Sequence, residues 1–350
     1  AALLSPLGAP LSDAPLTHKS SVSAVTFSSS GSLFASVEES SPCQLLVRRS
    51  SSGEVLRAAP VEDGGGMRLA FTSDEAHVVV VSKNKFITVI RINDGVEVGR
   101  HASMYNDWVR SVVFLERHSL VISGDDDGDL EVFRWAPGRA TPLAHMRTVS
   151  RAHSSYIMMI ATNAAETLLA SAGRDDCVRI WTLPELTNLR TIQRSGTVGH
   201  VAIGGEGDDT LVSCLSDADV ITFHSLATGS ASGELHLPDT VRALSVCSRM
   251  RSTLLVATGG ASSASVSMIN LSTRQVIATI PVRAQDTISA MSASPDGSRI
   301  LLGDGSGGCY LLARDLTSES ISTTRASLPI TGHADVSSLA QGGMGSSAPA

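Results

Sequence analysis

Serine, histidine and aspartate, the side chains of a hydrolytic triad, occur together once in the chain, between residues 153 and 181. A catalytic serine must reach its substrate, with a histidine as base and a carboxylate behind the histidine. Ser171 ends an apolar run, 168–171, that reads as a strand, so we expect its hydroxyl to be buried between strands. His153, Ser171 and Asp175 are therefore predicted to be structural, and the protein is predicted not to be an enzyme.

An acidic stretch, "GDDDGD" at residues 124–129, contains the oxygen ligands that calcium prefers. A calcium loop of the helix-loop-helix type needs Gly at its sixth position and Glu at its twelfth. Neither residue is in place when positions are counted from Asp125. We predict instead a turn between strands, in which Asp127 is structural and Asp125 and Asp126 are solvated.

Two further signals for a metal or cofactor site are incomplete. The five cysteines are scattered and form no CxxC pair, which argues against a zinc site or a disulfide framework and favours a reducing compartment, cytoplasm or nucleus. Residues 303–308, "GDGSGG", match the dinucleotide-binding GxGxxG pattern, but a strand follows where a helix is required. We predict a tight turn there, no metal and no cofactor.

The composition limits the possible partners. Hydrophobic residues make up 42% of the 350 residues and charged residues 17%, too apolar for a disordered chain, and no apolar run is long enough to span a membrane. The formal net charge of −7 disfavours nucleic acid, whose phosphates attract basic proteins. The chain begins with Ala rather than Met, so we expect it to be a piece of a longer protein.

The elements that position these residues recur along the chain. Trp181 closes the stretch that contains His153, and its equivalents are taken as Phe133, Phe223, Ile269 and Ala313, with spacings of 42 to 48 residues. Two more copies precede Phe133, which gives seven units. Each unit reads as four short strands, the first with alternating apolar residues, as in Val22, Val25 and Phe27. We predict an all-β fold, a seven-bladed β-propeller of four-stranded antiparallel sheets.

Residues Thr17 to Ser327 resemble the WD-repeat β-propeller family, in which a His, a Ser, an Asp and a Trp form a hydrogen-bonded chain within a blade. His153, Ser171, Asp175 and Trp181 match this set. The resemblance implies that they form such a chain, in which each buried polar group has a partner. Partial sets occur at Ser123, Asp127 and Phe133; at Ser213, Asp217 and Phe223; and at His18 and Ser36.

The chain divides into three segments. Residues 1–16 are an N-terminal segment, residues 17–327 the propeller, and residues 328–350 an extension whose Gly/Ser/Ala-rich end is expected to be disordered. Either end is a candidate to supply a strand that closes the ring and removes its edges.

The resemblance implies a non-enzymatic scaffold that binds peptide segments of other proteins on the propeller face, within a complex. Loop aromatics and arginines are common interface anchors, and the family pattern places the residue before each turn Asp on the top face. The candidate binding residues are Tyr105, Trp108, Arg110, Asp126, Tyr156, Arg174 and Ser216. The alternative for the aromatics is that they pack beneath their loops.

A rival hypothesis is binding to phosphoinositide or anionic membranes through an Arg-rich outer surface. The residues that suggest it are Arg134, Arg139, His145, Arg147, Arg151 and His153, together with the pair Arg48 and Arg49. Guanidinium groups pair well with phosphate.

Overall fold

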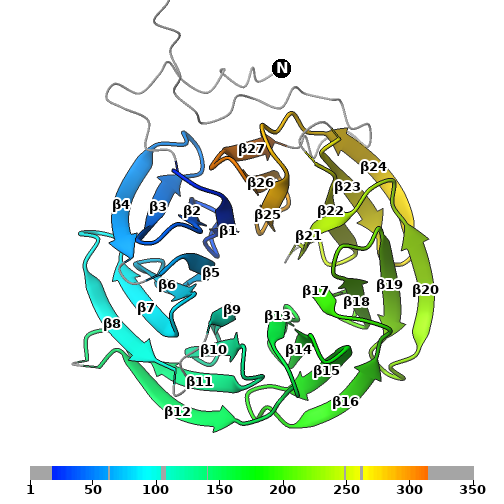
Figure 1. Ribbon diagram of the computed structural model, residues 1–350, viewed down its shortest axis with the longest axis horizontal. Coiled ribbons are helices and arrows are strands. Elements are labelled where there is room, and N and C mark those ends of the chain that lie inside the picture. The colour runs from blue at the N-terminus through cyan, green and yellow to red at the C-terminus, as the bar shows by residue number, and fades with distance from the viewer. Residues whose placement is uncertain are drawn as a thin grey trace, which may run out of the picture.

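Every described residue of the computed structural model belongs to a strand, a turn or a short connection, and none to a helix. The described residues are 18–61, 64–103, 108–139, 141–247, 250–260 and 263–313. No helix in these ranges could cross a membrane. The strands form seven antiparallel sheets arranged as blades around a central axis (Figure 1).

The first four blades each contain four strands that follow one another in sequence. Their bounds are β1 (Val22–Phe27), β2 (Leu33–Glu38), β3 (Cys43–Arg49) and β4 (Val55–Val61) in blade 1; β5 (Gly66–Phe71), β6 (His77–Ser82), β7 (Phe86–Arg91) and β8 (Glu97–Ala102) in blade 2; β9 (Val109–Leu115), β10 (Leu120–Asp125), β11 (Leu130–Trp135) and β12 (Leu143–Val149) in blade 3; and β13 (Ile157–Thr162), β14 (Leu168–Gly173), β15 (Cys177–Thr182) and β16 (Asn188–Gln193) in blade 4.

The last three blades continue the pattern. Their bounds are β17 (Val198–Gly204), β18 (Thr210–Leu215), β19 (Val220–Ser225) and β20 (Ala231–His236) in blade 5; β21 (Val241–Val246), β22 (Thr253–Thr258), β23 (Ser265–Asn270) and β24 (Gln275–Pro281) in blade 6; and β25 (Ile288–Ala293), β26 (Arg299–Asp304) and β27 (Cys309–Ala313) in blade 7. The predicted seven-bladed propeller is confirmed. The fourth strand predicted for the last unit, at residues 320–326, lies outside the described residues, as do the two terminal segments.

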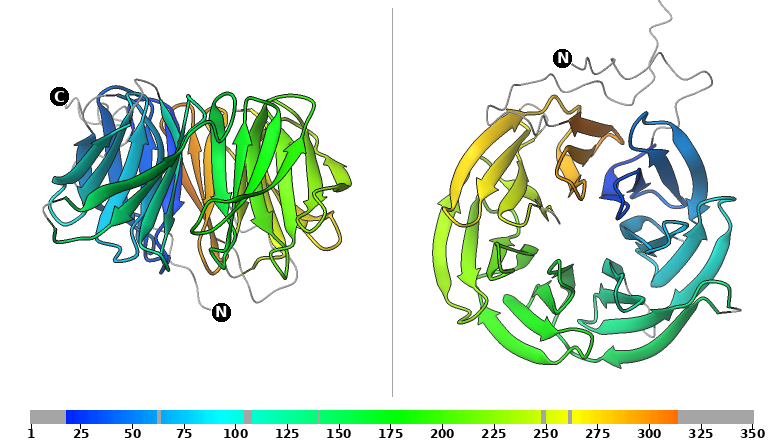
Figure 2. Two further views of the ribbon diagram at one scale, coloured as in Figure 1. Left: turned by 90° about the horizontal axis from the view of Figure 1, so that it is seen from below. Right: turned by 180° about the vertical axis from the view of Figure 1, so that it is seen from behind.

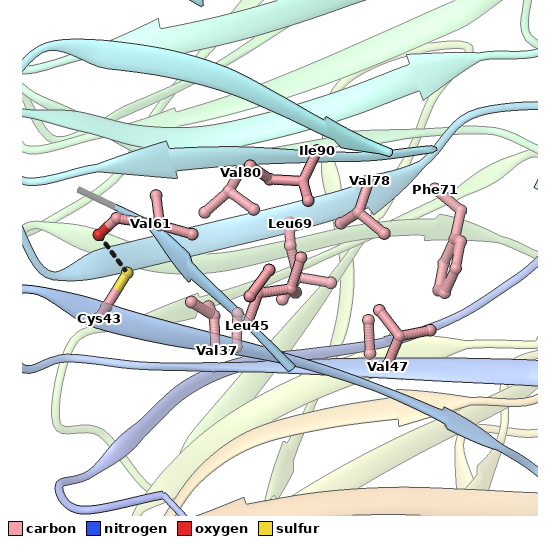
Figure 3. Packing of buried hydrophobic residues seen from close by; sticks show 13 residues of the cluster. Val37, Cys43, Leu45, Val47, Val61, Leu69, Phe71, Val78, Val80 and Ile90 are labelled. Carbon is pink, nitrogen blue, oxygen red and sulfur yellow. Dashed lines mark hydrogen bonds between the residues drawn. The ribbon is translucent and has the colours of Figure 1, made fainter. Parts of the chain in front are cut away.

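The core lies between neighbouring blades. Val37, Leu45 and Val47 of blade 1 pack against Leu69 and Val80 of blade 2, as Figure 3 shows. Because strand side chains alternate between the two faces of a sheet, each blade buries one face against the blade before it and the other against the blade after it. The stability of a blade therefore depends on both of its neighbours.

The ring closes between the first and last blades. Strand β1 packs beside β25, and Ser289 Oγ donates a hydrogen bond to the Val22 carbonyl (2.5 Å). Val22 and Phe34 share a hydrophobic cluster with Leu301 and Cys309 of blade 7. The side view in Figure 2 shows the resulting disc.

The two faces of the disc carry different turns. Since consecutive strands are antiparallel, the turn between the second and third strands of a blade lies at the same end as the connection into the next blade. We call this end the top face. The turns between first and second strands and between third and fourth strands lie at the opposite, bottom face.

Candidate functional site

Four side chains of blade 4 are joined by hydrogen bonds. Trp181 Nε1 donates to Ser171 Oγ (2.9 Å), and the Ser171 hydroxyl donates to His153 Nε2 (2.6 Å). His153 Nδ1 then donates to Asp175 Oδ1 (2.8 Å). The tautomer with the proton on Nδ1 follows from these partners, because Nε2 accepts. Arg179 Nη1, which lies near both groups, therefore bonds to Asp175 Oδ2 (2.7 Å).

The charges in this chain are set by burial and by the hydrogen bonds. Burial lowers the pKa of His153, so the imidazole is neutral at pH 7. Burial alone would raise the pKa of Asp175, but hydrogen bonds from His153, Ser154 and Arg179 outweigh it and lower the pKa to about 2. Ser171 is 0% exposed, so its hydroxyl is inaccessible to a substrate in this arrangement. The four residues link the strands of one blade.

Blade 1 contains a shorter version in which a glutamate lies near the histidine, with Glu38 Oε2 3.8 Å from His18 Nδ1. His18 Nε2 lies 2.7 Å from Ser36 Oγ, while Glu38 Oε2 accepts the backbone N–H groups of Lys19 (2.6 Å) and Ser20 (3.1 Å). Sequence reasoning missed Glu38 because it follows Ser36 by two residues rather than four. The sequence signal that could have found it is an acidic residue at the end of a mostly apolar strand. Glu38 is buried in the structure.

In blade 5 the residue equivalent to Trp181 is His224, and the expectation of Phe223 was wrong. Trp181 stands opposite Leu169 in the sheet, and His224 stands opposite Leu211 in the same way. His224 Nε2 lies 3.0 Å from Ser213 Oγ. The turn before β19 is one residue longer than the turn before β15, which shifts the register.

The longer turn also changes the role of the turn aspartate in blade 5. The Asp217 side chain is 86% exposed, whereas that of Asp175 is 5% exposed. In blade 7 the prediction of Ala313 was also wrong by one residue, because Leu312 pairs with Ile300 at the position of Trp181.

The acidic turn of blade 3 has the opposite arrangement from the one predicted. Asp125 and Asp126 are buried, whereas Asp127 is exposed. Asp125 Oδ1 accepts the backbone N–H of Asp129 (2.9 Å), and Asp126 pairs with Arg110, whose Nη2 lies 3.0 Å from Oδ2. Burial raises the pKa of Asp125 to about 7. The prediction that Asp125 is solvated was wrong because Asp125 is the last residue of β10, and its side chain is packed within the blade.

Four of the predicted binding residues, from blades 3 and 4, stack on one another at the top face. The Arg110 guanidinium lies 4.9 Å from the Trp108 ring centroid and 5.1 Å from that of Tyr156. The Arg174 guanidinium lies 5.1 Å from the Tyr156 ring centroid, and Lys83 Nζ of blade 2 lies 5.0 Å from the Trp108 ring centroid. We call Lys83, Trp108, Arg110, Tyr156 and Arg174 the aromatic–cation row.

The row is partly open to solvent. Trp108 is 36% exposed, Arg174 is exposed and Tyr156 is half-buried. Arg110 is held from below by Asp126, and Lys83 pairs with Glu39 of blade 1. Lys83 was missed by sequence reasoning, since nothing in the sequence links its turn in blade 2 to Trp108 in the connection to blade 3. Only the tertiary structure shows that Lys83 contacts both Glu39 and Trp108.

The other three predicted binding residues are not in the row, and one of them, Asp126, pairs with Arg110. Ser216 is exposed in the turn between β18 and β19 of blade 5, where its N–H donates to the Thr197 carbonyl (2.9 Å). Tyr105 lies outside the described residues.

Comparison with known proteins places this geometry in a family. A family model described as "WD domain, G-beta repeat" matches residues 145–182, a range that ends one residue after Trp181 of the hydrogen-bonded chain. The chain is a WD-repeat propeller. It is 25% identical over 231 residues to WD repeat-containing protein 55 of Mus musculus, a match that covers 65% of this chain and 56% of the mouse protein.

Two further relatives have the same name. The Rattus norvegicus protein is 25% identical over 231 residues, covering 65% of this chain and 57% of the relative. The Homo sapiens protein is 29% identical over 133 residues, covering 38% of this chain and 31% of the relative. The chain thus spans about half the length of the rodent relatives it matches. WD-repeat propellers serve in general as protein-interaction scaffolds and are typically not enzymes.

The described part of this WD-repeat propeller contains no group of three His, Cys, Asp or Glu side chains placed to hold a metal. All five cysteines are free and buried. The glycine-rich residues 303–308 comprise the end of β26 and the turn before β27, where Asp304 Oδ1 accepts the N–H groups of Ser306 (3.0 Å) and Gly308 (2.8 Å). This turn is closed by its own carboxylate.

The Arg-rich stretch of the WD-repeat propeller is divided between interior and surface. His153 is 0% exposed in blade 4, and Arg48 is buried while its neighbour Arg49 is exposed. Arg134, Arg139 and Arg151 are exposed. The rival hypothesis of a membrane-binding outer surface receives no support from the comparisons or from this distribution.

Proposed function

We propose that this WD-repeat propeller is a non-enzymatic scaffold that binds a peptide segment of a partner protein across the aromatic–cation row, within a larger complex. The observation that carries the proposal is the contact of aromatic rings and cations from three adjacent blades on one face. Trp, Tyr and Arg are the residues that most often dominate binding energy at protein interfaces.

The row offers two kinds of contact to a peptide. The Trp108 ring presents apolar area, and the exposed Arg174 guanidinium presents several donors to backbone carbonyls or carboxylates. Arg110 is held in place by Asp126, and it supports the rings on either side of it. A surface that is already ordered loses less conformational entropy on binding, which favours affinity.

The test is an affinity purification with the tagged chain and with the double variant Trp108→Ala, Arg174→Glu. The double variant is expected to lose the partners that the wild type retains. Arg49→Glu, an equal charge reversal on β3 of blade 1, is the matched control and is expected to keep them. Circular dichroism confirms that all three proteins are folded. Unchanged partners of a folded double variant would overturn the choice of this face.

We also propose a reducing compartment, cytoplasm or nucleus, because the five thiols are all free and buried. Imaging of the tagged protein in cells tests this, and a secreted or vesicular signal would contradict it.

A further inference from the structure

A cavity of about 360 Å³ lies at the bottom face, on the outer rim between blades 3 and 4. Its walls are apolar: Leu120 and Val132 come from the sheet of blade 3, Met146 from outer strand β12, and Pro184 from the turn that joins β15 to β16. The aromatic–cation row belongs to the top face, so the two surfaces are separate. We call this cavity the rim groove.

Met146 gives the rim groove an exposed apolar edge. Its side chain is 46% exposed, although its neighbours on β12, His145 and Arg147, are polar. A single exposed apolar residue is ordinary on a protein surface. Met146 differs because it continues a concave apolar wall, and a flexible thioether adapts well to a varied ligand side chain.

Two arginines flank the rim groove without neutralisation. Among the described residues, neither Arg134 nor Arg147 lies in an ion pair. Arg147 Nη2 donates to the Pro184 carbonyl (2.7 Å), a neutral acceptor that leaves the charge in place. Glu185 is the one carboxylate among the lining residues, and His118 the one histidine. The groove therefore carries net positive charge on a chain whose formal net charge is −7.

We infer that the rim groove is a second peptide-binding site, which takes one apolar side chain from a partner segment and pairs the flanking acidic residues with Arg134 and Arg147. A volume of this size lies at the low end of the range for ligand pockets, about 300–1,000 Å³, and suits a single Leu, Met or Phe side chain. A guanidinium group can bind a carboxylate through two parallel hydrogen bonds, so acidic residues beside the apolar side chain would pair with the two arginines. A concave apolar wall between two cations fits such a peptide better than it fits a flat lipid surface.

The probe is a set of fluorescein-labelled octapeptides in which one central residue is Leu, Met, Phe or Ala and the flanks are acidic or basic. Fluorescence anisotropy with the whole chain is expected to show binding of the acidic peptides with Leu, Met or Phe. The Ala and basic versions are expected to bind at least about tenfold more weakly, because they lack the apolar side chain or the acidic flanks. A tenfold difference corresponds to about 1.4 kcal/mol of binding free energy.

Two variants locate the site, and two others serve as controls. Arg134→Glu with Arg147→Glu is expected to weaken binding at least about tenfold, and Met146→Glu is expected to abolish the preference for an apolar central residue. Arg49→Glu and the double variant of the top face, Trp108→Ala with Arg174→Glu, are expected to bind these peptides as the wild type does. Because of this last comparison, the rim groove stands or falls independently of the proposed function.

Three results would overturn the inference: equal binding of the Ala and Phe peptides, binding unaffected by charge reversal at Arg134 and Arg147, or no binding of any acidic peptide. Vesicles of phosphatidylcholine with phosphatidylserine form a further arm. Vesicle binding that is lost in the Arg134, Arg147 variant, with no peptide binding, would assign the surface to membranes instead.

Discussion

His224 Nε2 lies 3.0 Å from Ser213 Oγ, at the sheet position where Trp181 Nε1 lies 2.9 Å from Ser171 Oγ. Two chemically different rings thus provide the hydrogen-bond partner of the equivalent serine in neighbouring blades. Both rings are buried and both offer a ring nitrogen at the same place. Blades 4 and 5 therefore share the buried serine and its ring-nitrogen partner, but they do not share the indole.

Ser171→Ala should destabilise the protein more than an ordinary surface substitution does. It leaves the Trp181 N–H and His153 Nε2 without their partner, and each buried polar group without a hydrogen bond costs about 1–3 kcal/mol. Urea unfolding followed by tryptophan fluorescence measures the loss. Ser216→Ala, on an exposed turn, is the matched control and should stay within about 0.5 kcal/mol of wild type. Equal stability of the two variants would contradict a structural role for the chain.

His224 makes stability fall on acidification. Burial lowers its pKa from the ordinary value of 6.5 to about 4, so the unfolded chain binds the proton more readily than the folded one. Its contribution is present above pH 6.5 and is lost as pH falls toward 4, by about 1.4 kcal/mol per pH unit. Urea midpoints between pH 4 and pH 7 measure this. His224→Gln, which keeps a side-chain donor, should give a flatter profile over that window, and an unchanged slope would contradict the assignment.

Asp125 has the opposite pH dependence. Burial raises its pKa from 3.8 to about 7, so the folded state favours the protonated acid and stability falls as pH rises between these values. Asp125→Asn keeps an oxygen acceptor for the Asp129 N–H and carries no charge. The variant should match wild type near pH 4 and exceed it at pH 8 by about 1–3 kcal/mol. A variant less stable than wild type at pH 8 would show that the carboxylate is needed there.

Glu166 joins blade 4 to blade 3 at the bottom face. Its carboxylate accepts the backbone N–H groups of Glu116 (2.9 Å) and Arg117 (2.9 Å), although its own φ of 53° is unfavourable for a residue with a Cβ. Glu166→Ala keeps the unfavourable φ and loses both bonds, so it should cost about 1 kcal/mol. Glu166→Gly also loses the bonds but relieves the backbone, so it should recover part of that loss. Thermal denaturation ranks the three proteins, and Gly below Ala would contradict the argument.

Much of the fold could be predicted because its signals are local. Strand alternation and turn residues lie within a few positions of one another, and the period of about 45 residues repeats them along the chain. The set His153, Ser171, Asp175 and Trp181 was recognisable for the same reason, since one blade contains all four residues. The groups that meet in blade 4 are brought together by two hairpins.

Register was less accessible to sequence. The prediction of Phe223 was wrong by one residue, because an extra turn residue shifts β19 without changing its apolar pattern. The prediction of Ala313 was also wrong by one residue, although blade 7 has the same register as blade 4 and places Leu312 at that position. Alternation shows which residues share a face but leaves the pairing across the sheet undetermined. The error at Asp125 and Asp126 has a related cause, since the end of β10 within an acidic run has no apolar residue to mark it.

The sequence by itself determined the all-β class, the number of blades and the buried chain of blade 4, because these depend on short-range patterns repeated along the chain. The tertiary structure alone decided that Lys83, Trp108, Arg110, Tyr156 and Arg174 share one row, and that Arg134 and Arg147 flank one groove. These residues belong to different blades, and only closure of the ring fixes the distances between blades. The physical reason is that surfaces form between blades, whereas the sequence signals lie within them.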